Sequence, residues 1–240
     1  MLHHSFANLD GHDDDIDMGA LGRLSPEQPR LPFHRFQHLY IWPLYGFIAV
    51  KWHFYDDFYS WITGKVGERE MTRPTGKDAL VLVGGKIVFA MLAFVIPALI
   101  HPIGWVIAFY LLVSFVQGVT LAVVFQLAHC VEEAAFPVVG EDGQMEHDWA
   151  AHQLMTTVDF ARDNPLVTWY VGGLNFQVEH HLFPRISHIH YPAIAEIVAE
   201  TAEEYGLPYL DQPTLTGAIA SHFRHLRKLG RPEAQQPVPA

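Results

Sequence analysis

The sequence has 240 residues, of which 50% are apolar and 17% are charged, and its formal net charge is −11. This length allows one domain or at most two, and the apolar composition excludes an intrinsically disordered chain. The acidic balance argues against nucleic acid as a partner, and the single cysteine excludes a disulfide framework. The 16 histidines outnumber the 15 lysines and arginines, which suggests metal chemistry in or beside a membrane.

Residues 1–80 are expected to be cytoplasmic or interfacial. The first 20 residues hold four aspartates between positions 13 and 17, and they lack the apolar run of a signal peptide. No local start signal precedes the first histidines, as in a chain that begins inside a domain. Residues 39–50 are apolar, but these twelve residues are too few to span a bilayer. Pro43, Gly46 and the aromatic side chains around them favour an interfacial or re-entrant segment.

Residues 87–128 contain no aspartate, glutamate, lysine or arginine, and the sequence HPIG at 101–104 interrupts them. A helix of about 20 residues spans the hydrocarbon core of a bilayer, so this stretch predicts two spans joined by a tight turn. We expect them at 81–101 and 104–127, with Lys86 extending its ammonium group toward the interface. The alternative, a buried helical hairpin in a large soluble core, is disfavoured by so long an uncharged stretch.

The charges that flank this hairpin indicate its orientation. Basic residues precede it, whereas the turn between the two spans carries none, so the segment before the hairpin is expected to be cytoplasmic. Two crossings return the chain to the same side, and both termini are therefore expected in the cytoplasm. The basic residues are Lys65, Arg69, Arg73, Lys77 and Lys86.

Residues 128–230 are expected to form a cytoplasmic helical cap, and residues 231–240 a loose tail rich in proline and glutamine. Within the cap, helices are expected at 191–206, where proline marks the first turn and glycine the end, and at 213–229. The basic, amphipathic pattern of the second helix suits either a membrane surface or an ordinary solvated face.

Three groups of histidines suggest a metal site. They are the pair His3-His4, the single His129, and the pair His180-His181. Because the predicted hairpin returns the chain to its starting side, all of them are expected at the same face of the membrane. Adjacent residues of a helix are about 100° apart, so His180 and His181 can address two different metal ions. Imidazole suits iron, copper, zinc and nickel, and the absence of a cysteine pattern disfavours structural zinc.

Residues 172–184 read GGLNFQVEHHLFP and resemble the third histidine box of the membrane-bound fatty acid desaturases. Gln177, at the first position of that box, resembles the front-end type, such as the delta-6 or linoleoyl-CoA desaturases. His3-His4 with the acidic residues 11–17 resembles the end of the second box, and FQLAH at 125–129 resembles the stretch that gives one more iron ligand. The resemblance implies five metal ligands, which are His3, His4, His129, His180 and His181. The residues expected to support them through hydrogen bonds or a bridging water are Gln177, His152 and Asp14.

The resemblance implies an all-α integral membrane protein, with a single desaturase domain over 1–240. A transmembrane helical hairpin at 81–127 would join a cytoplasmic helical cap that carries a di-iron site. The implied cofactors are two iron ions and O2, with electrons from cytochrome b5 or ferredoxin, and the implied substrate is an acyl-CoA or acyl-lipid that gains a cis double bond. The family's first histidine box and an upstream pair of spans have no counterpart in this sequence. We therefore expect the C-terminal part of a desaturase, with an incomplete metal site and no activity alone.

Other interpretations of the same residues stay open. One is a related membrane hydroxylase or ketolase, against which the sequence QxEHH argues. Others are a non-catalytic membrane remnant that binds iron weakly, and a membrane-anchored metal-binding or scaffold protein. The sequence fixes neither the double-bond position nor the acyl carrier, the electron donor or the oligomeric state.

The remaining histidines and aromatic residues have simpler interpretations. Histidines in polar or interfacial stretches are expected to be solvated, namely His34, His38, His53, His222 and His225. Aromatic residues of the second span are expected either to line an acyl tunnel or to pack and face lipid, namely Trp105, Phe109, Tyr110 and Phe115.

Overall fold

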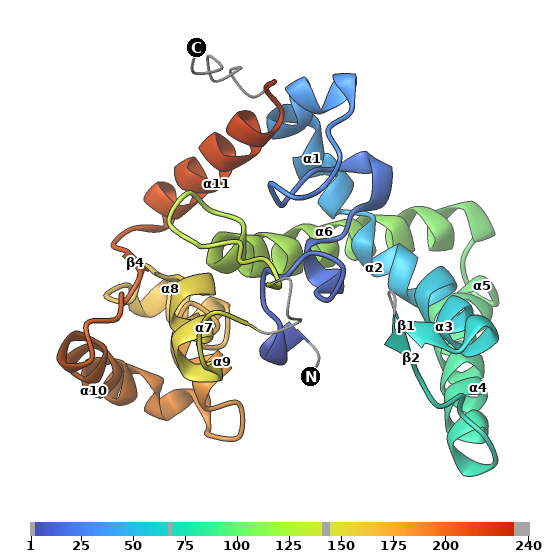
Figure 1. Ribbon diagram of the computed structural model, residues 1–240. Helices are drawn as coiled ribbons and strands as arrows, with labels where there is room; N and C mark the ends of the chain where they lie inside the picture. Colours follow the sequence, from blue (N-terminus) through green and yellow to red (C-terminus); the bar gives the residue numbers. More distant parts are fainter. Residues whose placement is uncertain (1–2, 67–68, 141–144, 233–240) are drawn as a thin grey trace. The chain divides into compact units, whose positions relative to one another are not determined.

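The computed structural model describes residues 3–66, 69–140 and 145–232, and these residues are mostly helical (Figure 1). The chain divides into two compact units, of which the first is Met1–Ile41 with Val123–Ala240 and the second is Trp42–Ala122. The expected loose tail lies outside the described residues from 233 onward. Among the described residues, two short strand pairings depart from the expected all-α class. They are β1 (Lys65–Val66) antiparallel to β2 (Arg69–Glu70), and β3 (Asp159–Phe160) parallel to β4 (Asp211–Gln212).

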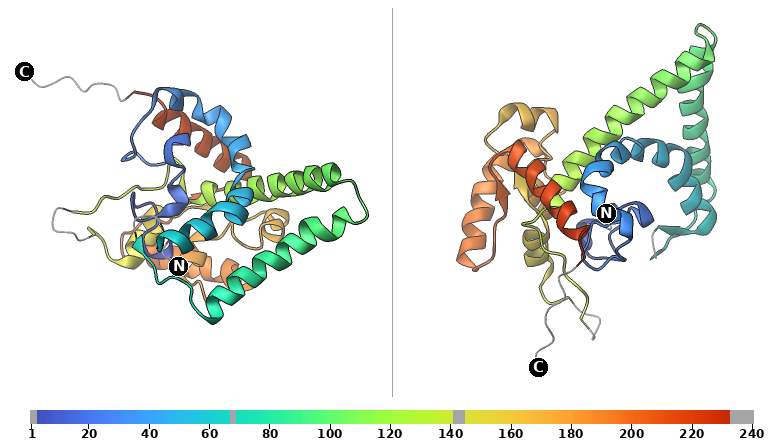
Figure 2. Two further views of the ribbon diagram at one scale, coloured as in Figure 1. Left: turned by 90° about the vertical axis from the view of Figure 1, so that its right-hand side faces the viewer. Right: turned by 90° about the horizontal axis from the view of Figure 1, so that it is seen from above.

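Two helices of the described residues are long and apolar enough to cross a membrane, as the sequence predicted. The first covers Lys77–Ala98, 22 residues, and the second is α6 (Ile103–His129), 27 residues. The first passes through α4 (Lys77–Ala90), a π-helical turn at Met91–Val95, and α5 (Ile96–Ala98). Figure 2 shows the turn by which α5 leads into α6.

The ends of these helices differ from the predicted spans by one to four residues. The first begins at Lys77 rather than 81, because the backbone of Gly76 takes a φ of +53° and Asp78 then occupies the first helical turn. It ends at Ala98 rather than 101, since the chain turns ahead of Pro102. The second helix includes His129 as its last residue, where the sequence predicted an end at 127.

The second unit opens with a series of short helices. They are the end of α1 (Gln37–Tyr45), α2 (Ile48–Lys51), a π-helical turn at Trp52–Asp56, and α3 (Asp57–Thr63). The positive charge of Lys86 in α4 is balanced by this series of helices. Its Nζ lies 2.6 Å from Asp57 Oδ2 and 2.7 Å from the carbonyl oxygen of His53. The lysine that we expected to extend toward the interface is therefore neutralised by an ion pair within the unit.

Two glycines allow the turn after α1 to approach α6 closely. A Cβ atom on Gly46 would lie 2.0 Å from the ring of Phe115, and one on Gly118 would lie 2.6 Å from the carbonyl oxygen of Tyr45. Both distances are too short for any side chain larger than hydrogen. The ring of Phe115 thus packs against the backbone at Gly46.

The first unit consists of turns near the N-terminus and of the cap helices. The 3-10 turns lie at His3–Ser5, Asp14–Ile16, Gly19–Leu21, Pro32–Phe36 and His188–His190. The helices are α7 (Trp149–Thr156), α8 (Pro165–Tyr170), α9 (Gln177–Leu182), α10 (Tyr191–Glu204) and α11 (Leu215–Leu229). The last two confirm the helices expected at 191–206 and 213–229 to within two residues.

Polar caps and apolar contacts hold these helices in place. Asp148 and Thr214 accept hydrogen bonds from the first turns of α7 and α11, which satisfies backbone donors there. Val178 of α9 is fully buried and packs with residues of α7 and α10, so α9 is held between these two helices. The end of α6 is anchored in the same way, because Leu127 is fully buried against Phe160.

Three histidines that we expected to be solvated are buried. Nδ1 of His222 lies 2.6 Å from the carbonyl oxygen of Cys130, and Nε2 of His225 lies 2.8 Å from that of Leu24. His34 is also buried, with its Nε2 2.9 Å from the carbonyl oxygen of Ala20. The prediction was wrong because backbone carbonyls far away in sequence satisfy these rings, and sequence position does not reveal such partners.

Candidate metal centre

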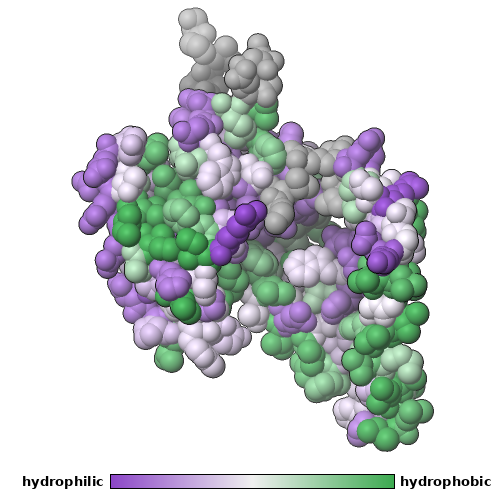
Figure 3. Space-filling model, turned by 90° about the horizontal axis from the view of Figure 1, so that it is seen from below, coloured by the Kyte–Doolittle hydropathy of each residue, from purple (hydrophilic) through white to green (hydrophobic). Residues whose placement is uncertain are grey.

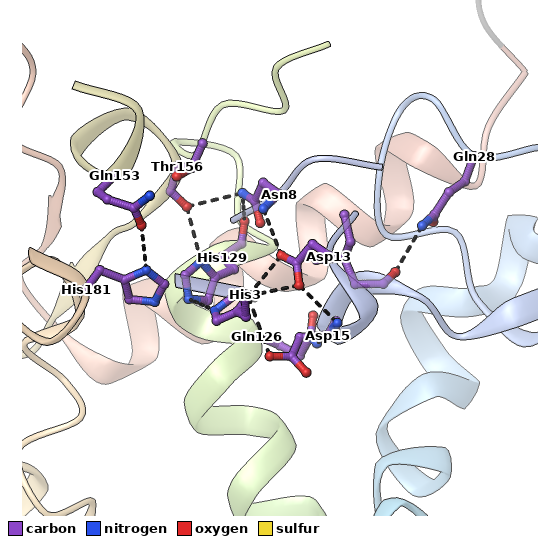
Figure 4. A network of polar contacts seen from close by, with 11 residues as sticks. His3, Asn8, Asp13, Asp15, Gln28, Gln126, His129, Gln153, Thr156 and His181 are labelled. Atoms are coloured by element: carbon purple, nitrogen blue, oxygen red, sulfur yellow. Dashed lines mark hydrogen bonds and ion pairs between the residues drawn. The ribbon is translucent and has the colours of Figure 1, made fainter. Parts of the chain in front are cut away.

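Three histidines from distant parts of the first unit converge on one point. They are His3 in the first 3-10 turn, His129 at the end of α6, and His181 in α9 (Figure 4). One nitrogen atom of each lies within 4.8 Å of the others. Nε2 of His3 and Nε2 of His129 are 3.2 Å apart. The end of α6 and helix α9 thus place the imidazoles of His129 and His181 close to that of His3.

The opposite nitrogen of each ring has an oxygen partner. Nδ1 of His3 lies 2.9 Å from Asp13, Nδ1 of His129 lies 3.2 Å from the carbonyl oxygen of Thr156, and Nδ1 of His181 lies 2.8 Å from Gln153 Oε1 (Figure 4). An oxygen acceptor at Nδ1 favours the tautomer that carries its hydrogen there. Each Nε2 then presents a lone pair toward the other two rings, which is the arrangement that a metal ion needs.

His4 and His180 extend this group to five histidines. Their ring centroids are 4.7 Å apart, and the ring of His4 stacks on that of His181 at 4.4 Å. Nδ1 of His180 lies 3.3 Å from the hydroxyl of Tyr191, whereas Nδ1 of His4 is buried without a hydrogen-bond partner among the described residues. The structure therefore brings together all five histidines that the resemblance implied. We refer to them below as the histidine cluster.

The electrostatics of the histidine cluster keep most of its rings neutral. Burial, followed by the charges of His129 and His3, holds the pKa of His181 well below its ordinary value. Burial and the neighbouring His180 lower the pKa of His4 to about 4. Burial disfavours charge on His3 as well, but the hydrogen bond and charge of Asp13 outweigh it and raise the pKa of His3. At neutral pH, His4 and His181 are thus free of competing protons.

The carboxylate that supports His3 is Asp13, whereas we expected Asp14. Asp13 is buried and also accepts hydrogen bonds from the backbone N–H groups of Asn8 and Asp15, at 2.8 Å and 3.0 Å. Asp14 is exposed in the 3-10 turn Asp14–Ile16. Asp13 caps that turn, so its side chain points back toward His3 while Asp14 begins the turn on the outer side.

Asn8 ties the N-terminal segment to the rest of the site. Its Nδ2 donates to three carbonyl oxygens, those of His129 at 2.9 Å, Ala135 at 3.1 Å and Thr156 at 3.2 Å. Its backbone has a φ of +59°, a left-handed conformation that asparagine tolerates better than most residues. One side chain therefore connects the N-terminal segment with the end of α6 and the end of α7.

The two other residues that we expected to support the ligands are buried in the first unit. Gln177 lies in the first turn of α9, and its Nε2 has no hydrogen-bond partner among the described residues. His152 lies in α7, and its Nε2 is likewise unpaired within the described part of the chain. Its neighbour Gln153 makes the contact with His181, and no motif in the sequence pointed to that glutamine.

The sequence also did not point to a second polar group, to which Glu179 of α9 contributes. The hydroxyl of Tyr209 lies 2.7 Å from Asp159 Oδ2 and 3.0 Å from Glu179 Oε1. A hydroxyl has one hydrogen to donate, so one of the two carboxyls must carry a proton to complete both bonds. Burial, with the charge of the neighbouring Glu179, raises the pKa of Asp159 well above its ordinary value, and burial also raises that of Glu179. The side chain of Glu179 thus contacts Tyr209.

The second unit contains an apolar cavity of about 830 Å³. Three of the four aromatic residues considered for an acyl tunnel line it, and Phe115 is not among the lining residues. His53, which we expected to be solvated, lines it too, and its Nδ1 lies 2.9 Å from the hydroxyl of Tyr110. The three aromatic residues are Trp105, Phe109 and Tyr110.

Comparison with known proteins points in one direction. The family model described as fatty acid desaturase matches residues 1–213. The chain is 40% identical over 235 residues to an acyl-lipid (8-3)-desaturase of Physcomitrium patens, with 96% of this chain and 49% of that protein covered. It is 39% identical over 231 residues to the sn-1 linoleoyl-lipid 6-desaturase of Arthrospira platensis (95% and 62% covered), and 38% identical over 232 residues to that of a Synechocystis strain (96% and 65%). The chain thus spans about half to two thirds of the length of these curated relatives. No solved structure matches it.

Proposed function

Since this chain belongs to the fatty acid desaturase family, we propose that its histidine cluster holds iron and that it is the iron-binding part of an acyl-lipid desaturase. One observation carries this proposal. Three imidazoles have their Nδ1 atoms on oxygen acceptors, which leaves three Nε2 lone pairs directed toward one another. The family generally uses a di-iron centre, and a donor set made only of imidazoles suits iron.

The geometry of the cluster fits a metal ion. Metal–nitrogen bonds of about 2.1 Å at angles near 100° place two ligand nitrogens about 3.2 Å apart. The separation of 3.2 Å between Nε2 of His3 and Nε2 of His129 agrees with this value. In our proposal His3, His129 and His181 face one iron ion, and His4 and His180 face the second. Five histidines would not complete the ligand sets of two iron ions, so water or further protein groups would be needed as well.

Each residue of the site has a separate task in this proposal. Iron held by the histidine cluster would supply the oxidising chemistry with O2, which no side chain can perform. Asp13 orients His3 and favours its Nδ1–H tautomer, and Gln153 does the same for His181. Burial of His129 and His181 excludes water from the inner side of the site. The raised pKa of His3 means that a proton competes there most strongly with a metal ion.

The substrate and the membrane arrangement are proposed on the same basis. Relatives are named for linoleoyl-lipid and other acyl-lipid substrates, and we propose an acyl-lipid here as well. The helices Lys77–Ala98 and α6 would cross the membrane with both termini in the cytoplasm. Electrons would come from cytochrome b5 or ferredoxin.

Iron content of the purified chain tests the proposal. We expect iron to co-purify with the unchanged protein, and to be lost from His129→Ala and His181→Ala variants. The matched control is His101→Ala, because His101 is exposed in the turn before α6 and should be dispensable. If all three variants retained iron equally, the cluster would not be the site.

A further inference from the structure

A group of large apolar side chains lies exposed on the first unit, outside the histidine cluster. Trp169 is 80% exposed, Leu166 75% and Ile189 69%. Phe183 and Ile186, in the segment after α9, are also exposed. In Figure 3, apolar side chains gather on the surface at the left of the view. We call these five residues the apolar ledge.

The two halves of the ledge are neighbours in space. α8, which carries Trp169, and the 3-10 turn that carries Ile189 line the same cavity of about 430 Å³. The backbones approach closely beneath it, since a Cβ atom on Gly173 would lie 2.8 Å from Cβ of His188. Gly173 also has a φ of +78°, which glycine adopts without strain. Trp169 and Ile189 therefore border one hollow, and the other three residues of the ledge lie in the same two segments, α8 and 183–189.

The composition of the ledge fits the interface of a lipid bilayer. Tryptophan prefers the headgroup level, where its ring is buried and its N–H group stays wet, and the aliphatic residues favour the acyl region. Residues 183–190 contain the exposed Arg185 and two histidines but no aspartate or glutamate, which suits anionic headgroups. A surface with so many apolar side chains is unfavourable if it stays in contact with water.

The same unit also holds part of an apolar helix. The first unit contains the end of α6, a helix long and apolar enough to cross a membrane, and the family is membrane-associated. We propose that the apolar ledge inserts into the membrane interface and gives the cap an attachment of its own, separate from the two apolar helices. This proposal requires neither bound iron nor desaturase activity, so its failure would leave the proposed function untouched.

Site-directed fluorescence labelling tests the ledge in the whole chain. Cys130 is the chain's one cysteine and is fully buried, so it can stay in place while a bimane label is attached at Trp169→Cys or Ile189→Cys. The matched control is Glu200→Cys, on the exposed side of α10 in the same unit. Each labelled chain is reconstituted into vesicles of phosphatidylcholine and phosphatidylglycerol. Quenching is measured with a lipid that carries a nitroxide near its headgroup and with iodide in the water.

At positions 169 and 189 we expect the nitroxide lipid to quench several-fold more strongly than at position 200, and iodide to quench several-fold less. Iodide quenching at 169 and 189 equal to that at 200 would mean that the ledge lies in water and would overturn the proposal. Quenching by neither reagent would mean that protein covers the ledge, and would overturn it as well. All positions are exposed in the structure, so the substitutions leave the core intact, and far-ultraviolet circular dichroism checks this.

Discussion

At the scale of single residues, the site depends on oxygen atoms that hold the ring nitrogens facing away from the cluster. Gln153→Leu removes the acceptor that lies 2.8 Å from Nδ1 of His181. We expect the affinity for iron to fall about 10- to 100-fold, the usual cost of losing the partner of a metal-bound histidine. Metal titration of the purified chain measures this. Gln153→Glu keeps an oxygen in place and should bind nearly as well as the unchanged chain, so equal weakening of both variants would contradict the role.

The buried carboxyl pair beside α9 leads to a prediction about pH. The folded pKa of Asp159 lies well above the value of about 3.9 that an unfolded aspartate has. Above about pH 4 the unfolded chain has released a proton that the folded chain still holds, so the free energy of unfolding falls as the pH rises toward the raised pKa. Asp159→Asn should flatten this decline, as measured by heat denaturation in detergent at several pH values. The exposed Asp163→Asn is the control and should keep the decline, and a decline equally steep in Asp159→Asn would disprove the assignment.

At the scale of elements, the packing within the second unit depends on Gly118 in α6. Gly118→Ala would place a Cβ atom 2.6 Å from the carbonyl oxygen of Tyr45, and the backbone at Tyr45 cannot move as a side chain can. We expect a loss of about 1–3 kcal/mol in stability, typical of overpacking. Gly84→Ala in α4 is the matched control, because no atom lies within 4 Å of its Cβ position. Alanine there should be neutral or stabilise the helix by about 0.5–1 kcal/mol. Thermal unfolding in detergent that ranked the variants in the opposite order would refute this packing.

Helices whose signals lie within their own residues could be predicted from the sequence. The uncharged stretch predicted α6. The helices α10 and α11 begin and end near the proline, glycine and periodic apolar residues from which they were predicted. Properties that depend on distant partners could not be predicted. The basic helix that carries His222 and His225 suggests solvated rings. In the structure both rings are buried, and a ring nitrogen of each forms a hydrogen bond with the carbonyl group of Cys130 or Leu24.

The same limit applies to the candidate site. The histidine pairs could be found because a short motif carries them, and in the structure they lie close to His129. The choice of Asp13 over Asp14 depends on the direction of one 3-10 turn, which four neighbouring aspartates do not reveal. Gln153 and Tyr209 contact their partners only after α7, α9 and β4 have packed, so no local pattern could identify them.

At the scale of the whole molecule, the proposed function requires the N-terminal segment and the cap to share one compartment. If the two apolar helices cross the membrane as proposed, a reporter fused after Ala240 should be active only in the cytoplasm, and so should one fused before Met1. Reporters active on opposite sides of the membrane would imply an odd number of crossings. The histidine cluster could not then form, since His3 and His181 would lie on different sides.

The three carbonyl groups that Asn8 holds have a consequence for biosynthesis. The segment that carries His3 leaves the ribosome first, whereas His129 follows it by 126 residues and His181 later still. The N-terminal segment is therefore made before the residues that it contacts, because α6 and the cap follow it in the chain. The carbonyl groups of His129 and Thr156 lie at the ends of α6 and α7, so Asn8 can form these bonds only after both helices have formed. The proposed iron site would in turn be complete only after α9 has packed, because α9 carries His181.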